Sequence, residues 1–107
     1  MTYWDTDYKG GWGPFSISQE HPFAKAGLFL LHDVWYDQLK SGTATKTLKQ
    51  IDREFLANML RVAAKVFWFT KDPADLALYT RHAWRFYRIA RFWAKYVRPE
   101  LEAYRPK

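Results

Sequence analysis

The chain has 107 residues, enough for one domain with a single hydrophobic core. It contains no cysteine, which excludes disulfide bonds, thiolate metal sites and thiol nucleophiles. Residues 1–37 carry two lysines against five acidic residues, a net charge of −3, whereas the whole chain has a net charge of +6. We therefore expect a cation to suit the first part of the chain and an anionic surface to suit the second.

Residues 1–21 are expected to form an irregular segment, because glycines occur there among aromatic and acidic residues without any periodicity. Glycines such as Gly11 and Gly13 allow turns in which backbone carbonyls converge, and Asp5 and Asp7 lie nearby in the sequence. The segment is therefore a candidate oxygen-rich cation loop. The alternative is an N-terminal arm that packs its aromatic side chains on the core.

The remaining sequence predicts an all-α fold in a single domain, residues 1–107. We expect three long helices over residues 22–40, 46–70 and 73–97, followed by a frayed tail over residues 98–107. Gly27 lies inside the first predicted helix and costs about 1 kcal/mol relative to alanine. Its presence suggests that another backbone approaches closely at this point.

Local signals place the ends of these helices. Pro22 suits the first turn of the first helix, and Gly42 suits its end. Thr47 and Gln50 have the spacing of a capping box at the start of the second helix. Asp72, followed by proline, is a strong start for the third helix.

No apolar run in the chain is long enough to cross a bilayer, so we expect a soluble protein.

A histidine and an aspartate are predicted to face each other across the first two helices. The short connector makes these helices antiparallel neighbours. His32 and Asp52 each lie roughly 10–12 Å from the connector at a rise of about 1.5 Å per residue. A buried carboxylate beside a histidine fixes its tautomer and stabilises the protonated ring, as a general base requires. The alternative is a structural network in which His32, Asp52 and Tyr36 satisfy one another.

Asp33 is predicted to face a different neighbourhood from His32. It points about 100° away around the helix, plausibly towards the N-terminal segment. A cation held by Asp33 and loop carbonyls would lie beside the edge of the His32 ring. There it would polarise a carbonyl and stabilise an oxyanion while His32 activates a water molecule.

Two motifs in the predicted helices carry a family resemblance. The pattern HD-x-x-Y at residues 32–36 is followed about fifteen residues later by ID-x-x-F-x-x-x-M at residues 51–59. The pair resembles the core of the secreted phospholipase A2 superfamily, especially its short prokaryotic and fungal branch. It also resembles a family of small phage-encoded proteins, which the cysteine-free chain fits better. The resemblance covers roughly residues 22–60.

The phospholipase resemblance implies a calcium-dependent ester hydrolase that acts on lipid, with an antiparallel two-helix core. It assigns His32 as the base for water, Asp52 as its orienting partner and Asp33 as the calcium ligand. It assigns Tyr36 as a supporting hydrogen-bond donor.

The enzymes that the chain resembles have a glycine-rich calcium loop before the histidine helix. Here its only candidate is residues 9–13, with Gly11 and Gly13 as ligands through their carbonyls. This stretch departs from the pattern of the enzymes, and the disulfides that brace their helices are absent.

The third predicted helix carries a basic stripe flanked by aromatic residues. Its members recur every three or four residues: Arg81, Arg85, Arg88, Arg91, Lys95 and Arg98. The stripe would suit an anionic lipid surface, as the hydrolase hypothesis requires. It would also suit nucleic acid, with stacking by Trp84 or Phe92, although we weigh this partner below lipid. The plain alternative is a solvated face.

A further alternative is a non-catalytic phage protein that keeps the helical scaffold. It would act as a virion component or bind a host factor, so a phage or host protein is also a candidate partner. The expected location is then the host cytoplasm or the virion.

Overall fold

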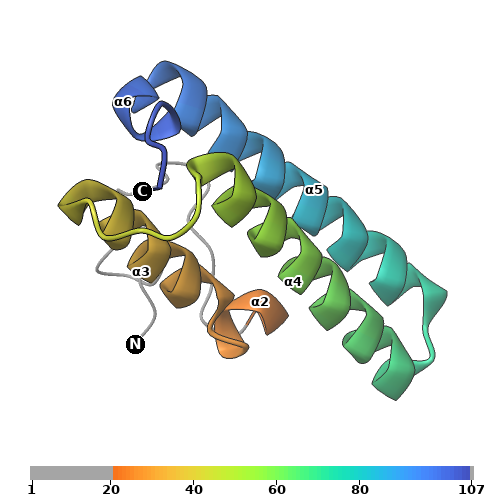
Figure 1. Ribbon diagram of the computed structural model, residues 1–107. Helices are drawn as coiled ribbons and strands as arrows, with labels where there is room; N and C mark the ends of the chain where they lie inside the picture. Colours follow the sequence, from red (N-terminus) through yellow and green to blue (C-terminus); the bar gives the residue numbers. More distant parts are fainter. Residues whose placement is uncertain (1–20, 107) are drawn as a thin grey trace.

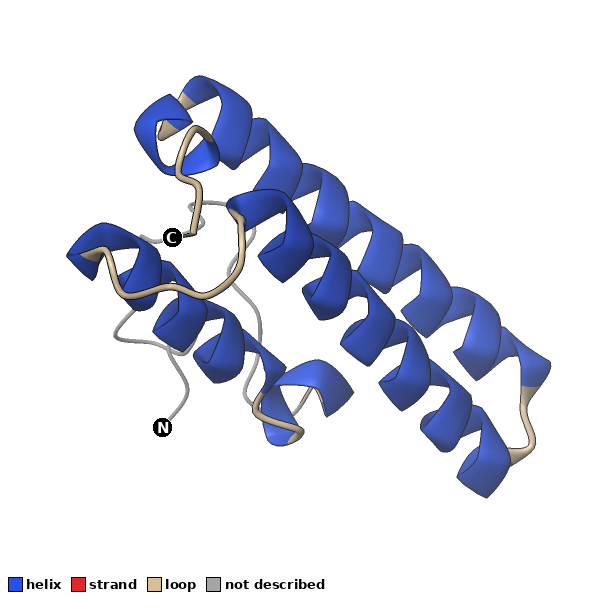
Figure 2. Cartoon of the chain, in the orientation of Figure 1, coloured by secondary structure: helices blue, strands red, loops and turns tan. Residues whose placement is uncertain are grey.

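The computed structural model describes residues 21–106, and this part of the chain contains helices and no strand (Figures 1 and 2). The all-α prediction is therefore confirmed for these residues. The helices follow one another in the order α2 Pro22–Lys25, α3 Leu28–Ser41, α4 Leu48–Thr70, α5 Pro73–Tyr96 and α6 Pro99–Glu102.

The two longest helices, α4 and α5, form a hairpin in which they pack side by side along their length (Figure 1). α3 runs in the opposite direction to α4 and packs on it, with the short α2 at its start (Figure 1). α6 folds back at the end of α5 and also contacts α4. α4 therefore contacts every other helix of the described chain.

The helix ends follow the chemistry that the sequence predicted. The side chain of Thr47 accepts a hydrogen bond from the backbone N–H of Gln50, and the side chain of Gln50 accepts one from the backbone N–H of Thr47. This reciprocal capping box starts α4. Asp72 caps α5 by accepting from the backbone of Ala74, with Pro73 in the first turn.

The first predicted helix is wrong in one respect, because the chain breaks at Gly27. This glycine has φ +73° and separates α2 from α3. A Cβ atom built on Gly27 would meet nothing within 4 Å, so the expected close approach of another backbone is not found. Gly27 is needed for its left-handed backbone conformation instead. His21 caps the resulting short helix by accepting from the backbone of Phe23.

The tail over residues 98–107 was predicted to be frayed, and this prediction is wrong for the described residues, which are docked on the core. Leu101 on α6 is buried in the same cluster as Leu48 and Ile51. The hydroxyl of Tyr104 donates to the carbonyl of Ala44 at 2.9 Å. The tail therefore closes the end of the molecule where α4 begins.

Two buried hydrophobic clusters flank the centre of the α3–α4 contact. One contains Phe29 and Phe55, and the other contains Tyr36 and Ile51. Each of these pairs has one member on α3 and one on α4, and the polar residues of interest lie between them along both helices. The core therefore holds the candidate site between two apolar layers.

Candidate active site

The structure brings His32 and Asp52 together as the count from the connector predicted. Nε2 of His32 lies 2.7 Å from Oδ1 of Asp52. The two side chains are almost completely buried, with exposed fractions of 2% for His32 and 0% for Asp52. A charged or polar pair removed from water to this extent must be held by good hydrogen bonds.

Aromatic rings fix the plane of the His32 imidazole. The ring centroids of Tyr36 and Phe55 lie 4.5 Å and 4.4 Å from that of His32, both tilted relative to it. Trp93 of α5 stacks on Tyr36 at 5.3 Å. The imidazole is therefore held by packing as well as by its bond to Asp52, which limits its rotation.

The bond to Asp52 determines which nitrogen of His32 is basic. Because a carboxylate only accepts hydrogen bonds, Nε2 of His32 carries the proton and donates it to Asp52. In the neutral ring Nδ1 is then the nitrogen with a lone pair. Nδ1 is buried and has no hydrogen-bond partner within the part of the chain that the structure describes. This is the arrangement of a general base whose partner carboxylate lies behind it.

The second oxygen of Asp52 is bound by an arginine that sequence reasoning placed elsewhere. Nη1 of Arg91 on α5 lies 2.8 Å from Oδ2 of Asp52, and Nη2 of Arg91 bonds Glu102 of α6. The position of Arg91 on the helix could have indicated that it faces inward. Arg91 lies next to Ala90 and three residues before Ala94, and both alanines are buried on α5. Arg91 and Glu102 are the residues of the site that sequence reasoning missed.

Tyr36 lies in the site but does not make the hydrogen bond that the resemblance implies. Its hydroxyl is buried and has no hydrogen-bond partner among residues 21–106. Burial raises the pKa of Tyr36 above its ordinary value, and the nearby charge of Asp52 raises it further, while Arg91 lowers it. The hydroxyl therefore stays neutral and able to donate.

Asp33 is buried beside the pair but is separate from it. Its Oδ2 atom has no hydrogen-bond partner among the described residues. Burial, and then the charge of Asp37, raise the pKa of Asp33 to about 8, while Lys40 lowers it. A buried carboxylate oxygen with no donor is a suitable ligand for a hard cation such as calcium.

Asp33 is, however, the only predicted metal ligand that the structure describes. Gly11 and Gly13 lie outside the described residues. Across residues 21–106, no group of three or more His, Cys, Asp or Glu side chains is gathered as a metal site. The calcium site therefore stays a prediction, with Asp33 among the described residues and the predicted carbonyl ligands outside them.

The residues of the predicted basic stripe do not all lie on the open surface of α5. Arg91 faces inward to Asp52 with an exposed fraction of only 23%, so it does not belong to the open surface. Arg98 pairs with Glu100. The remaining members point outward or line a hollow on α5, namely Arg81, Arg85, Arg88 and Lys95.

No family model, curated protein or solved structure matches this chain. Among the described residues, no helix is both long enough and apolar enough to cross a membrane.

Proposed function

We propose that the chain is a phospholipase A2-like ester hydrolase in which His32 is the general base and Asp52 its orienting partner. One observation carries the proposal: the buried Nε2 of His32 bonds Asp52 at 2.7 Å, while its Nδ1 has no partner within residues 21–106. A purely structural histidine would be expected to satisfy both ring nitrogens. The proposal follows the resemblance to the short phospholipase branch and to small phage-encoded proteins.

The pair can carry out both halves of a hydrolysis. In the first half, Nδ1 of His32 takes a proton from a water molecule as the water oxygen attacks the ester carbonyl carbon. Asp52 stabilises the imidazolium that forms, because it accepts the Nε2 proton throughout. In the second half, the imidazolium returns the Nδ1 proton to the alcohol oxygen as its bond to the carbonyl carbon breaks. The products are a carboxylic acid and an alcohol, and His32 is neutral again.

The cost of the arrangement supports a function beyond packing. Each buried polar atom left without a partner costs about 1–3 kcal/mol of stability. Three atoms without a partner among residues 21–106, His32 Nδ1, Asp33 Oδ2 and Tyr36 OH, come from five consecutive residues of α3. Unpartnered polar groups concentrated in this way are characteristic of functional sites rather than of cores.

Calcium is the cofactor that the resemblance implies, and Asp33 fits it as one ligand. When bound there, the ion would polarise the ester carbonyl and stabilise negative charge on its oxygen. The remaining predicted ligands are carbonyls of Gly11 and Gly13. The role of this chain's own residues is unchanged by the ion: Asp33 holds it, and His32 moves the proton.

A second function has one observation in its favour. Arg91 and Glu102 extend the His32–Asp52 pair into a chain of charges that joins α3, α4, α5 and α6. Such a chain would also serve a non-catalytic scaffold, because it fixes how four helices dock. In that case the protein acts through a partner surface, as a virion component or a binder of a host factor.

Fatty-acid release from phospholipid vesicles in millimolar calcium decides between these functions. We expect release by the wild-type protein and a loss of about 100-fold or more in His32→Gln. His82→Gln is the matched control, because His82 is a partly buried histidine on α5 outside the site. Thermal unfolding followed by circular dichroism checks that both variants are folded.

Calcium titration provides a second readout. We expect calcium to raise the thermal midpoint of the wild-type protein, and we expect Asp33→Asn to abolish this rise. A folded wild-type protein that releases no fatty acid would reject the hydrolase and leave the scaffold. Equal release by wild type and His32→Gln would reject His32 as the base.

A further inference from the structure

The open face of α5 carries a straight row of positive charges. Arg81, Arg88 and Lys95 are spaced seven residues apart and are all exposed. Seven residues are nearly two helical turns, so the three side chains project from one side of α5 at intervals of roughly 10 Å. These three residues are half of the predicted basic stripe; of the others, Arg91 faces inward and Arg98 pairs with Glu100.

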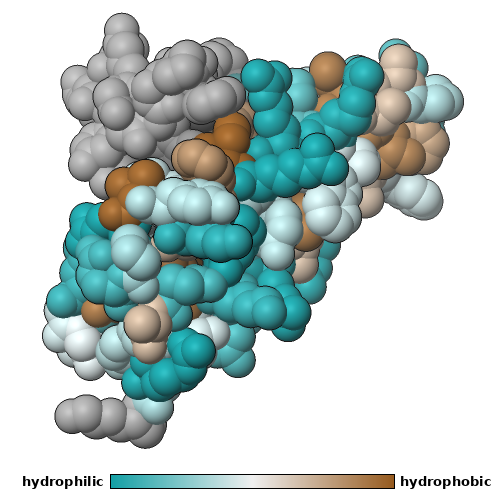
Figure 3. Space-filling view, turned by 90° about the horizontal axis from the view of Figure 1, so that it is seen from above, coloured by the Kyte–Doolittle hydropathy of each residue, from teal (hydrophilic) through white to brown (hydrophobic). Residues whose placement is uncertain are grey.

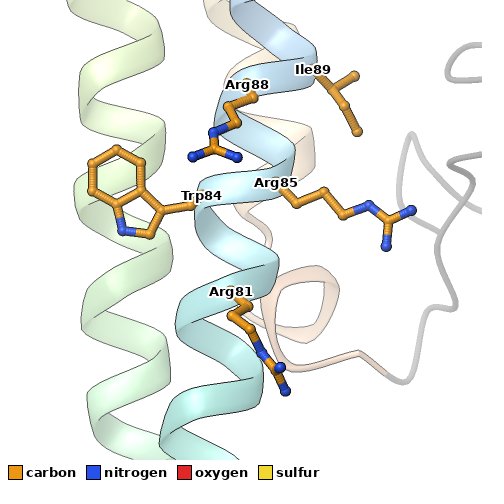
Figure 4. A pocket seen from close by; sticks show the side chains of 5 residues that line it. All are labelled: Arg81, Trp84, Arg85, Arg88 and Ile89. Atoms are coloured by element: carbon orange, nitrogen blue, oxygen red, sulfur yellow. The ribbon is translucent and has the colours of Figure 1, made fainter.

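One end of this row forms a hollow. It is lined by two turns of α5, namely Arg81, Trp84, Arg85, Arg88 and Ile89. Figure 4 shows Trp84 and Arg88 reaching to the same side of α5, with Arg81 nearer the start of the helix. Arg85 extends to the other side of the helix (Figure 4). An indole and three arginine side chains thus line one hollow.

No acidic residue occurs in the sequence between residues 76 and 99. The two acidic residues of α6 are engaged elsewhere, because Glu100 pairs with Arg98 and Glu102 with Arg91. Along this stretch the helix therefore offers positive charge without an acidic neighbour in its own sequence. Such a surface is complementary to an anionic partner.

Aromatic rings accompany the charges on the same open face. Trp84, Phe92 and Tyr96 are exposed by 44%, 62% and 64%. The rings of Phe92 and Tyr96 contact each other, with centroids 4.9 Å apart. The face is therefore both basic and aromatic, in contrast to an ordinary solvated helix face, which is polar.

We infer that this face of α5 binds single-stranded nucleic acid, with Arg81, Arg88 and Lys95 contacting phosphates and Trp84 stacking on a base. A basic surface that follows a backbone and offers aromatic rings for stacking is the general design of single-strand binding sites. Guanidinium groups also suit phosphate, because they donate two parallel hydrogen bonds.

The shape of the face favours a strand over a membrane. Trp84 lines a hollow, and a flexible strand can enter a hollow that a lipid surface would span. The most exposed apolar side chains of the described chain, Trp68 and Phe69, lie instead at the end of α4. Hydrophobic side chains gather towards that end of the molecule among hydrophilic ones (Figure 3).

Fluorescence anisotropy of a labelled oligothymidylate, measured with the full chain over a range of salt concentrations, tests this inference. We expect the logarithm of the binding constant to fall with the logarithm of salt concentration with a slope of about −2, since three phosphates are neutralised. Arg81→Ala and Arg88→Ala should each reduce that slope by about 0.7. Trp84→Ala should weaken binding by about tenfold or more.

Matched controls distinguish this site from general attraction to a basic protein. Arg53→Ala removes an exposed arginine from α4, and Trp68→Ala removes an exposed tryptophan from the hairpin end; both should leave binding unchanged within about twofold. Circular dichroism confirms that each variant is folded. Binding that is absent, insensitive to salt or weakened equally by Arg53→Ala would overturn the inference.

Binding to vesicles of phosphatidylcholine, with and without phosphatidylglycerol, tests whether the face binds lipid instead. If the Arg81 and Trp84 variants lose binding to anionic vesicles while the wild-type protein does not bind the oligonucleotide, the face is a lipid surface and the inference is wrong. If the wild-type protein binds the oligonucleotide in preference to anionic vesicles, the inference is supported. The result does not depend on ester hydrolysis, because the surface residues lie outside the His32–Asp52 pair.

Discussion

Arg91 on α5 and Asp52 on α4 form an ion pair in which Nη1 lies 2.8 Å from Oδ2. The same carboxylate accepts from His32 through its other oxygen. Both oxygens of a completely buried carboxylate are thus matched by donors, which is the condition under which a charge is tolerated inside a protein. The ion pair therefore links the docking of α5 to the geometry of the candidate base.

Arg91→Met should destabilise the protein by about 2–4 kcal/mol, because it leaves Asp52 buried with one oxygen unpaired. Urea unfolding at neutral pH measures the change. Arg88→Met is the control on the same helix, where an exposed arginine is replaced, and it should change stability by no more than about 0.5 kcal/mol. Equal effects of the two substitutions would contradict a structural role for the ion pair.

Leu101→Ala should destabilise the protein by about 2–3 kcal/mol, because the side chain fills the cluster at the end of the core. Tyr104→Phe should cost about 1 kcal/mol through loss of the hydrogen bond to the carbonyl of Ala44. Urea unfolding measures both. If both variants unfold with the same free energy as the wild type, the docked tail contributes nothing to stability and the prediction is wrong.

Gly27→Ala should cost about 1 kcal/mol, because alanine is strained at φ +73° although its Cβ would meet no atom within 4 Å. Gly27→Asn should cost less, since asparagine tolerates the left-handed region better. Thermal unfolding compares the two. If asparagine is worse than alanine, side-chain size is the cause and the backbone explanation fails.

His21 and His82 form a hydrogen-bonded pair that joins α2 to α5. The backbone N–H of Phe23 donates to Nδ1 of His21, so the neutral His21 ring carries its proton on Nε2. Nε2 of His21 then donates to Nδ1 of His82 at 2.9 Å. A proton added to either ring removes one of the two acceptors, so both bonds require neutral histidines.

Stability should therefore fall as the pH falls from about 6.5 to about 4. Burial, and then the neighbouring His82, lower the pKa of His21 from 6.5 to about 4. Burial, and then Arg85 and Arg81, lower the pKa of His82. Because these pKa values are lower in the folded state, the unfolded state binds more protons over this range and is favoured by acid.

The expected loss of stability over that range is about 1–2 kcal/mol, since solvent screens a partly exposed pair. Urea unfolding at several pH values measures it. His21→Asn combined with His82→Gln keeps a capping side chain and removes both titrating groups, so its stability should depend less on pH between 6.5 and 4. An unchanged pH dependence would assign the effect to other groups.

Short-range chemistry let the sequence predict most of the helices. A capping box and an Asp-Pro pair act within one turn, so Thr47 and Asp72 mark helix starts wherever those helices later dock. The facing of His32 and Asp52 was predictable for a related reason. A short connector leaves two helices few ways to pack, and residues equidistant from it must meet.

The tertiary structure alone decided where Arg91 points and whether the tail is ordered. Arg91 lies 39 residues from Asp52 and 11 from Glu102 in the sequence. Its position at the edge of the buried face of α5 allows either a solvated or an inward orientation. The choice is made by the docking of α5 and α6 on α4, because only then does a buried carboxylate lie within reach of the guanidinium group. No local rule supplies that carboxylate, so sequence reasoning left Arg91 on the surface.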